Sequence, residues 1–218
     1  MTELVFDCVG ARAERWSVGP TMTFQIKVAE TAGETVHGIA LRCQIRIEPV
    51  KRKYSDTEGE KLVDLFGERS RWGDTMKPLQ LAFAAQMVPG FTGSADIELP
   101  VPFTYDFEVA TSKYFHALED GEIPLILLFS GTVFVKADQG FRVEQVPWHK
   151  ESAFRLPVAT WRQMMDTHFP NSAWIRVRTD TMDALSRFRS ERALPGWDET
   201  LAALLGEHDP SEKWGARP

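Results

Sequence analysis

The sequence has little cysteine and no long apolar run. Its two cysteines, Cys8 and Cys43, lie far apart in the chain, which excludes a disulfide scaffold and the paired CxxC motif of zinc sites. Both belong to apparent strands, where a free thiol usually acts as a small buried hydrophobe. No apolar stretch is long enough to cross a membrane, and charged residues interrupt the N-terminal apolar residues, so neither a transmembrane helix nor a secretory signal is expected. We therefore predict a cytoplasmic protein without a membrane span.

Basic residues are in the minority: 25 lysines and arginines stand against 31 aspartates and glutamates, and the net charge is −6. Because binding of DNA or RNA requires a basic face that neutralises phosphates, this balance argues against a nucleic-acid partner. The phosphate loop GxxxxGK[ST], the dinucleotide motif GxGxxG, the zinc motif HExxH and the nucleophile elbow GxSxG are missing. The five histidines show no metal-ligand spacing. The sequence predicts no catalytic residues, no metal and no cofactor.

Among the features that are present, residues 103–135 are the most informative. Their apolar and small residues first recur at the spacing of one helical face, which predicts an amphipathic helix over residues 106–120. Gly121 can take the left-handed exit from this helix, and Pro124 prevents its continuation. An unbroken apolar stretch follows at residues 125–129, which is typical of a strand that is buried on both faces.

Further strands are predicted on both sides of this segment. Strict alternation of apolar and polar residues marks three half-exposed strands at residues 4–8, 21–29 and 39–47. Apolar strands are also expected at residues 79–88, 97–101 and 141–146. The link between residues 21–29 and 39–47 is short and polar, so we expect these two strands to form an antiparallel hairpin.

Two segments differ from the strands in composition. Residues 51–74 are rich in charge and contain a short helical pattern, which indicates an insertion on the rim of the sheet. After residue 157, apolar residues recur on one helical face in each of three successive segments. We therefore predict a sheet domain at residues 1–148, a helical C-terminal subdomain at 149–205 and a flexible tail at 206–218.

The predicted fold class is α+β, with an antiparallel β-sheet, one packed helix and a C-terminal helical subdomain. An immunoglobulin-like sandwich is the alternative, and in that fold residues 107–118 would form a strand.

Tryptophan and arginine are concentrated in the C-terminal third, and both residue types are enriched at the energetic centres of protein interfaces. We expect a partner-binding surface there. Its candidate residues are Trp148, Trp174, Arg176, Arg178, Arg187, Arg189 and Arg192. The alternatives are that the tryptophans pack inside the protein and that the arginines lie on solvated helix faces with local ion pairs.

Four stretches carry a resemblance to a known family: VPFTYDFEVATSKYFHALEDGEIPLILLFSGTVF, VPWHKE, FRLPVATWRQMMD and RWGD. With them the chain resembles an uncharacterised family of actinobacterial proteins of about this length, and the resemblance covers nearly the whole chain. Members of that family are often encoded near genes for nickel–iron uptake hydrogenases and their maturation factors. The resemblance implies an accessory role and no particular catalytic residue.

The core also resembles, more faintly, the export chaperone SecB. In both, several strands precede a helix with a tyrosine, then a glycine, two residues and a strand rich in proline and leucine. Here these features are Tyr105, Gly121 and residues 124–128. The resemblance implies a SecB-like sheet, while the charged insertion at 51–74 and the long segment after Val135 depart from the SecB pattern and put its tetramer and client groove in doubt.

These observations predict a non-enzymatic accessory or assembly protein that binds another protein. The first resemblance implies hydrogenase subunits or maturation factors as its partners, and a homo-oligomer is left open. One alternative is an enzyme that binds a small molecule or an anion between the sheet and the C-terminal helices, using His149, Arg176 or Arg178. The other is a SecB-like chaperone that binds many client segments.

Overall fold

The protein is described from a computed structural model of residues 1–218. The structure describes residues 2–103, 109–137, 140–170, 175 and 177–208. The chain forms two compact units, Met1–Asn171 and Ser172–Pro218. The strands belong to the first unit, and the last two helices belong to the second.

The strands of the first unit form two open antiparallel sheets. The three-stranded sheet has the order β1-β2-β5. It consists of β1 (Leu4–Ala13), β2 (Thr21–Glu30) and β5 (Ser94–Pro102). The five-stranded sheet has the order β4-β3-β6-β7, and β8 also pairs with β6. It consists of β3 (Thr35–Ile47), β4 (Leu79–Thr92), β6 (Glu122–Lys136), β7 (Phe141–Gln145) and β8 (Glu151–Pro157). The predicted α+β class with antiparallel strands is confirmed.

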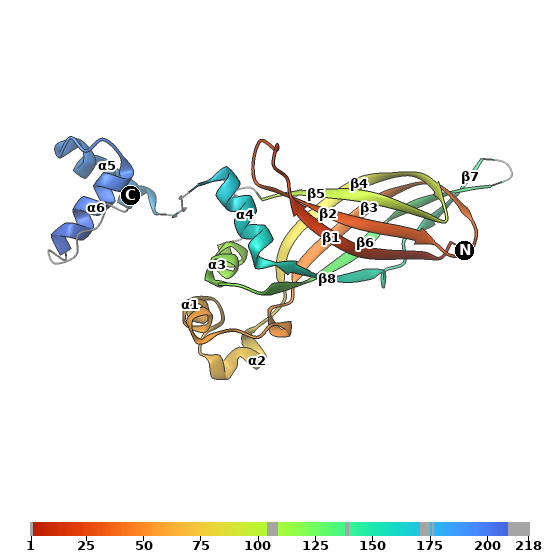
Figure 1. Cartoon of the computed structure of the whole chain (residues 1–218), viewed down its shortest axis with the longest axis horizontal. Coiled ribbons are helices and arrows are strands. Elements are labelled where there is room, and N and C mark those ends of the chain that lie inside the picture. The colour runs from red at the N-terminus through yellow and green to blue at the C-terminus, as the bar shows by residue number, and fades with distance from the viewer. Residues whose placement is uncertain (1, 104–108, 138–139, 171–174, 176, 209–218) are drawn as a thin grey trace. The chain divides into compact units, whose positions relative to one another are not determined.

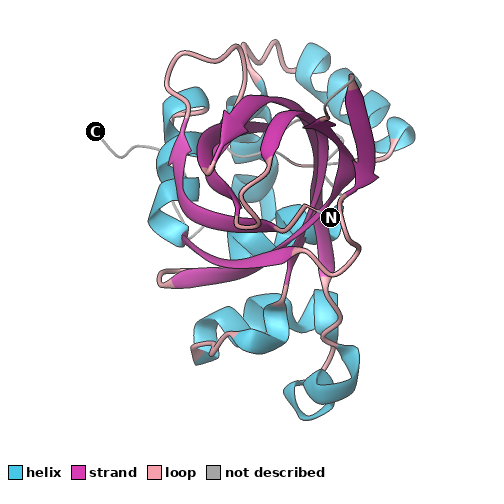
Figure 2. Ribbon diagram, turned by 90° about the vertical axis from the view of Figure 1, so that its right-hand side faces the viewer, coloured by secondary structure: helices cyan, strands magenta, loops and turns pink. Residues whose placement is uncertain are grey.

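Alternate side chains of the two sheets form one shared core, around which both sheets curve (Figure 2). Phe6 of β1 and Phe129 of β6 stack with their ring centroids 4.5 Å apart, so the inner faces of the sheets are in direct contact. Phe24 of β2 is fully buried and meets Phe154 of β8 edge to face. Burying one such side chain contributes roughly 1.5–3 kcal/mol, so this core is the main source of stability.

The prediction that β2 and β3 form a hairpin is wrong. β2 pairs with β1 and β5, whereas β3 pairs with β4 and β6, so the link after Glu30 carries the chain from one sheet to the other. The Glu30 carboxylate accepts hydrogen bonds from the backbone N–H groups of Ala32 and Glu34 and holds this corner. A short polar link suits a hairpin or a corner, and the packing of both inner faces on one core selects the corner.

Strand β6 changes its partner part-way along. Residues 122–128 pair with β8, and residues 132–136 pair with β7. Between them, Gly131 has φ of 144°, and a Cβ at this position would lie 2.1 Å from the carbonyl oxygen of Ala40, so only glycine fits. Strand β8 was not expected, because residues 151–157 were assigned to the helical subdomain.

Helix α3 (Val109–Ala117) confirms the predicted helix over its described part, since residues 104–108 lie outside the described residues. Tyr114 and Phe115 of this helix are fully buried. The sandwich alternative, with a strand at residues 107–118, is therefore wrong for residues 109–117. Figure 1 shows α3 and α4 (Val158–His168) at one end of the sheets, not on a sheet face.

The charged insertion forms a small helical cluster. It consists of η1 (Pro49–Lys51), α1 (Asp56–Phe66), η2 (Arg69–Arg71) and α2 (Trp72–Thr75). The Ser55 side chain accepts the N–H of Glu58, and the Glu58 carboxylate accepts the N–H of Ser55, which together form a capping box at the start of α1. Phe66 of α1 is buried, and its ring lies 6.3 Å from that of Tyr114. The insertion therefore packs against α3.

The first unit ends later than predicted. Residues 149–171 were expected in the C-terminal subdomain, but β8 pairs with β6, and α4 contacts β1, β2 and β8. Leu156, Val158 and Met164 are fully buried in the shared core. Because these apolar side chains occupy core positions, the chain leaves the core only after α4.

The second unit contains α5 (Thr179–Glu191) and α6 (Trp197–His208), where helical patterns were predicted. Helix α6 extends past the predicted end of the subdomain at residue 205, and residues 209–218 of the predicted tail lie outside the described residues. Within its described part, this unit fully buries no apolar side chain. None of the described helices of either unit has the length and apolar character needed to span a membrane.

Candidate functional site

The outer faces of the two sheets differ in polarity. On the three-stranded sheet, Asp7, Lys27 and Asp96 are exposed and lie in one row across β1, β2 and β5. Alternating charges in such a row are typical of a solvated face. On the five-stranded sheet, Phe83 and Met87 project from β4 with exposed fractions of 74% and 63%. The five-stranded sheet therefore has the more apolar outer face.

Strand β4 is an edge of its sheet and has no charged residue. The other edge strands carry charges, at Asp7 and Arg12 of β1, Asp96 and Glu98 of β5, Arg142 and Glu144 of β7, and Glu151 and Arg155 of β8. Proteins place charges, prolines and bulges on edge strands to prevent pairing with another chain. In β4 these devices are limited to Pro89 near its end and a register shift near its start. The middle of β4, residues 82–88, is unprotected.

The start of β4 is held by neighbouring side chains. The hydroxyl of Thr111 on α3 donates to the carbonyl oxygen of Gln80 at 2.8 Å, and the amide of the Gln80 side chain donates to the carbonyl oxygen of Ala82 at 2.8 Å. No described strand pairs with the outer edge of β4. Alternate backbone groups along an edge strand face away from the sheet, so the middle of β4 can form hydrogen bonds with an added strand.

Arg42 of β3 lies beside the middle of β4, opposite Ala85. Its side chain is exposed, and it forms no hydrogen bond or ion pair with any residue that the structure describes. A shallow depression of about 300 Å³ lies at this position. It is lined by Ala40, Leu41, Arg42, Ala85, Gln86 and Met87. The outer face of β4 thus combines exposed apolar side chains with a guanidinium group that has no described partner.

Trp148, one of the predicted partner-binding residues, lies in the link between β7 and β8. Its side chain is 91% exposed, and its ring meets the His149 ring edge to face with centroids 5.9 Å apart. His149 is exposed as well. Trp148 is therefore not packed in the core, and its contact with a partner stays a prediction.

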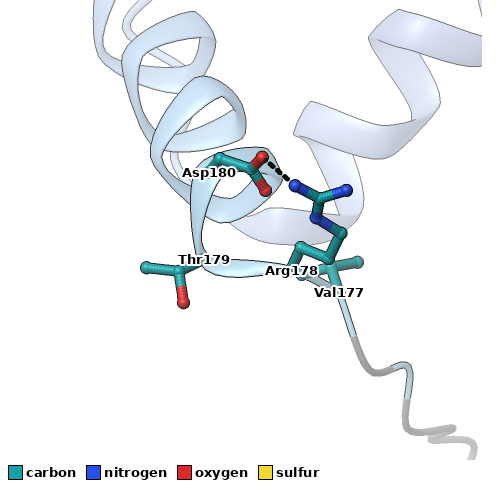
Figure 3. A pocket seen from close by; sticks show the side chains of 4 residues that line it. All are labelled: Val177, Arg178, Thr179 and Asp180. Atoms are coloured by element: carbon teal, nitrogen blue, oxygen red, sulfur yellow. Dashed lines mark hydrogen bonds and ion pairs between the residues drawn. The ribbon is translucent and has the colours of Figure 1, made fainter.

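Arg178, another predicted residue, lies just before α5 and is paired within its own unit. Its Nη2 lies 2.7 Å from Oδ2 of Asp180 (Figure 3). This contact offsets the positive charge of Arg178, so the hollow beside it has little to attract an anion. The predicted residues Trp174 and Arg176 lie outside the described residues.

The remaining predicted arginines lie on α5 or directly after it. The guanidinium of Arg189 lies over the ring of Trp197 at 4.3 Å, and that of Arg192 lies over the ring of Phe188 at 4.5 Å. Arg187 is exposed. Two of the three arginines therefore stack on aromatic rings of the same unit, a contact worth about 0.5–1 kcal/mol at exposed sites.

A buried ion pair joins the helical cluster to the core. Nη2 of Arg52 lies 2.5 Å from Oε1 of Glu58, and the two side chains are 7% and 3% exposed. The same guanidinium donates hydrogen bonds to the carbonyl oxygens of Asp120 and Glu122, which follow α3 and begin β6. Arg52 thus links the insertion to the segment between α3 and β6, which is distant from it in sequence.

The protonation states of Glu58, Tyr54 and Tyr114 suit a structural role. Burial alone would raise the pKa of Glu58, but hydrogen bonds from the N–H groups of Glu119 and Ser55, together with the guanidinium, hold that pKa below its ordinary value. Burial raises the pKa of Tyr54 to about 12, and its hydroxyl lies 2.9 Å from the hydroxyl of Tyr114. At neutral pH the carboxylate is charged and both phenols are neutral, so each group keeps its partner.

Both cysteines are buried free thiols, as predicted. Burial raises the pKa of Cys8 and of Cys43 to about 12, so neither thiol is ionised at neutral pH. A thiol acts as a nucleophile or metal ligand through its thiolate. The described residues also contain no group of three or more side chains suited to hold a metal ion.

Comparison with known families gives one result that covers nearly the whole chain. The profile of a family described as "Family of unknown function (DUF6084)" matches residues 1–213. The chain belongs to this family. The predicted membership of an uncharacterised family is thereby confirmed. A comparison with curated proteins gives no match for this DUF6084 chain.

Several solved structures are similar to the chain at low identity. A β-glucosidase from Kluyveromyces marxianus is 10% identical with a TM-score of 0.26, and the match covers 72% of this chain and 15% of that chain. The putative ApaA protein from Bordetella pertussis is 12% identical with a TM-score of 0.25, over 71% of this chain and 93% of that chain. The DUF6084 chain thus spans less than a sixth of the β-glucosidase. At these TM-scores the likenesses carry no conclusion about function.

The outer face of β4 was not among the sites predicted from the sequence. The apolar pattern predicts a strand at residues 79–88, but it assigns no role to Phe83, Met87 or Arg42. The available signal was the absence of charge over a whole strand of the DUF6084 chain, in a protein whose other strands are mostly interrupted by charge. That signal also fits a central buried strand, so the sequence alone did not identify an open edge.

Proposed function

We propose that this protein is a non-enzymatic accessory protein that binds another protein, and that it does so through the outer face of its five-stranded sheet. The observation that carries the proposal is the middle of β4, an uncharged edge strand from which Phe83 and Met87 project into solvent. Apolar patches that remain exposed on folded proteins commonly mark binding surfaces. An open strand edge adds backbone hydrogen bonds to the same surface.

Four buried titratable side chains of the first unit, those of Arg52, Glu58, Cys8 and Cys43, are consistent with this proposal, because they have structural roles. Arg52 and Glu58 neutralise each other between the insertion and the core. The thiols of Cys8 and Cys43 are protonated inside the core. These four side chains therefore stabilise the fold and lie away from the outer face of β4.

As the first partner to test, we propose a hydrogenase subunit or maturation factor, because the family that the chain resembles is often encoded near such genes. Deleting the gene should then lower the amount of assembled hydrogenase and leave its transcript unchanged. Normal amounts of assembled enzyme in the deletion strain would contradict this choice of partner.

The binding surface is tested with Met87→Lys in the full-length protein. Lysine at this position would bring an ammonium group into the centre of the interface, so the affinity for the partner should fall by about tenfold or more. Val9→Lys is the matched control, because Val9 is 56% exposed on another edge strand, β1. Both variants should keep the wild-type midpoint of thermal unfolding. Equal loss of affinity in both variants, or in neither, would contradict the proposed surface.

The C-terminal arginines provide a second surface to compare with β4. Because the first unit extends to residue 171, the deletion that tests them removes residues 172–218 and keeps β8 and α4. We expect the shortened chain to retain the partner, since the proposed surface lies on β4. Loss of binding on deletion, together with loss in Arg187→Glu at low salt, would place the main contact on α5 instead.

A further inference from the structure

We propose that the middle of β4 binds an extended segment of a partner protein in which an acidic side chain lies between two apolar ones. This inference rests on the proposed function and defines the chemistry of the segment that the same surface binds. Its starting point is Arg42, a cation on an apolar face.

The other arginines on strands of the first unit have polar partners. Arg12 pairs with Glu98, Arg142 with Glu34 and Arg155 with Glu122, and Arg46 donates to the Gln44 side chain. Arg42 differs from all four, because no residue within the described ranges forms a hydrogen bond or ion pair with it. A guanidinium group presents a planar fork of N–H groups that matches the two oxygens of a carboxylate. Arg42 is therefore suited to bind an acidic side chain from outside the described chain.

The register of the sheet defines where that carboxylate would lie. Arg42 is opposite Ala85 of β4 on one side and Ser130 of β6 on the other, and neither carries a charge. The short side chain of Ala85 leaves the path from Arg42 to the open edge free. A strand added to β4 would lie about 4.8 Å beyond it. The residue of that strand facing Ala85 would then be within reach of the guanidinium.

Phe83 and Met87 define the neighbours of the acidic residue. They lie two positions before and after Ala85, so all three side chains are on the same face of β4. In the added strand, the residues two positions before and after the acidic one would face them. Apolar cross-strand pairs are favourable at such positions, and methionine makes favourable contacts with aromatic rings. The segment recognised is therefore apolar-x-acidic-x-apolar in an extended conformation.

A second copy of this chain is the other occupant that an open edge invites. Two antiparallel copies of β4 would bring Phe83 and Met87 of both chains together. However, β4 has no acidic residue, so both Arg42 side chains would stay unpaired on the joined face. Charge complementarity therefore favours a partner segment that supplies a carboxylate.

Peptide selection tests the inference on the full-length protein. Short random peptides displayed on phage are selected on the wild-type chain, after removal of those that bind Met87→Lys. We expect the enriched peptides to share the pattern apolar-x-acidic-x-apolar. A synthetic peptide with this pattern should bind Arg42→Glu about tenfold more weakly than wild type, and its acidic-to-lysine version should recover affinity for that variant. Arg155→Glu, at another edge of the same sheet, is the matched control and should bind like wild type.

The outcomes separate the two proposals. Peptides that require Met87 but bind wild type and Arg42→Glu equally would overturn the inference and leave the proposed surface in place. If no peptide binds wild type more tightly than Met87→Lys, both proposals are overturned. Enrichment of apolar peptides of any charge would indicate promiscuous client binding and overturn the inference. A concentration-dependent dimer that is detected by sedimentation velocity and abolished by Met87→Lys would show that a second copy binds β4. This result would also overturn the inference.

Discussion

At the scale of single residues, Arg52 shows how strongly context changes the role of a side chain. It belongs to a run of three basic residues that suggests a solvated segment, yet its guanidinium is almost completely buried against Glu58. A buried ion pair contributes little by itself, because desolvation of two charges offsets their attraction. Removal of one partner is costly, because it leaves the other charge buried and uncompensated.

Arg52→Ala should therefore lower the free energy of unfolding by about 3 kcal/mol. Lys61→Ala is the matched control, since Lys61 forms an ion pair with Glu119 in which both side chains are more than 40% exposed. The control should cost less than about 1 kcal/mol. Urea unfolding followed by tryptophan fluorescence measures both changes. Similar losses in the two variants would mean that burial does not determine the importance of the Arg52 pair.

Glu58 also predicts a pH dependence. Its pKa is lower in the folded protein than its ordinary value, so between these two values the unfolded chain binds this proton more readily. The stability that Glu58 contributes is then fully present above its ordinary pKa and is lost as the pH falls through the folded pKa. The difference in unfolding free energy between wild type and Glu58→Gln should accordingly shrink in that acid range. A difference that stays constant with pH would contradict the lowered pKa.

At the scale of elements, β6 holds the five-stranded sheet together. It pairs with β3 along one side and with β7 and β8 along the other. The two partners on the second side meet at Gly131, where the backbone of β6 approaches Ala40 of β3. The change of partner therefore depends on a position that has no side chain.

Gly131→Ala should destabilise the protein by more than about 3 kcal/mol, because the added methyl group meets the backbone of β3 and the strand must move. Gly33→Ala is the matched control: its φ is also positive, at 83°, but no atom lies within 4 Å of an added Cβ. The control should show only conformational strain, about 1–2 kcal/mol. Denaturant unfolding of both variants gives the comparison. An equal loss at both glycines would show that contact with Ala40 is not important.

At the scale of the whole molecule, the two compact units differ in how they bury apolar surface. The first unit has a large shared core, to which β8 and α4 contribute fully buried residues. The described helices of the second unit leave their apolar side chains at least partly exposed. Most of the stability of the chain should therefore belong to the first unit.

Two truncations test this division. A chain that ends at residue 171 should fold, with a thermal midpoint within about 4 °C of the full-length protein, a shift that corresponds to at most about 2 kcal/mol for a unit of this size. A chain that ends at residue 148 should not fold, because it lacks β8 and α4. Circular dichroism during heating distinguishes the two. Aggregation of the longer fragment would contradict this division of the stability between the two units.

Elements with local signals can be predicted from the amino-acid sequence alone. The apolar spacing at residues 109–117 predicts α3, the following apolar run predicts β6, and the helical pattern at Leu62, Leu65 and Phe66 predicts α1. Each signal lies within one element, where the periodicity of side chains is fixed by backbone geometry. The α+β class follows from these elements without knowledge of their neighbours.

Strand neighbours and open sheet faces, in contrast, depend on how the whole chain packs. The corner between β2 and β3, the inclusion of β8 in the sheet and the burial of Arg52 depend on contacts between residues distant in sequence. The same is true of the proposed binding surface, because an apolar residue such as Phe83 is compatible with a buried or an exposed position until the strands are placed. Which edge of a sheet stays unpaired is a property of the assembled core, since an edge exists only where no further strand of the chain arrives.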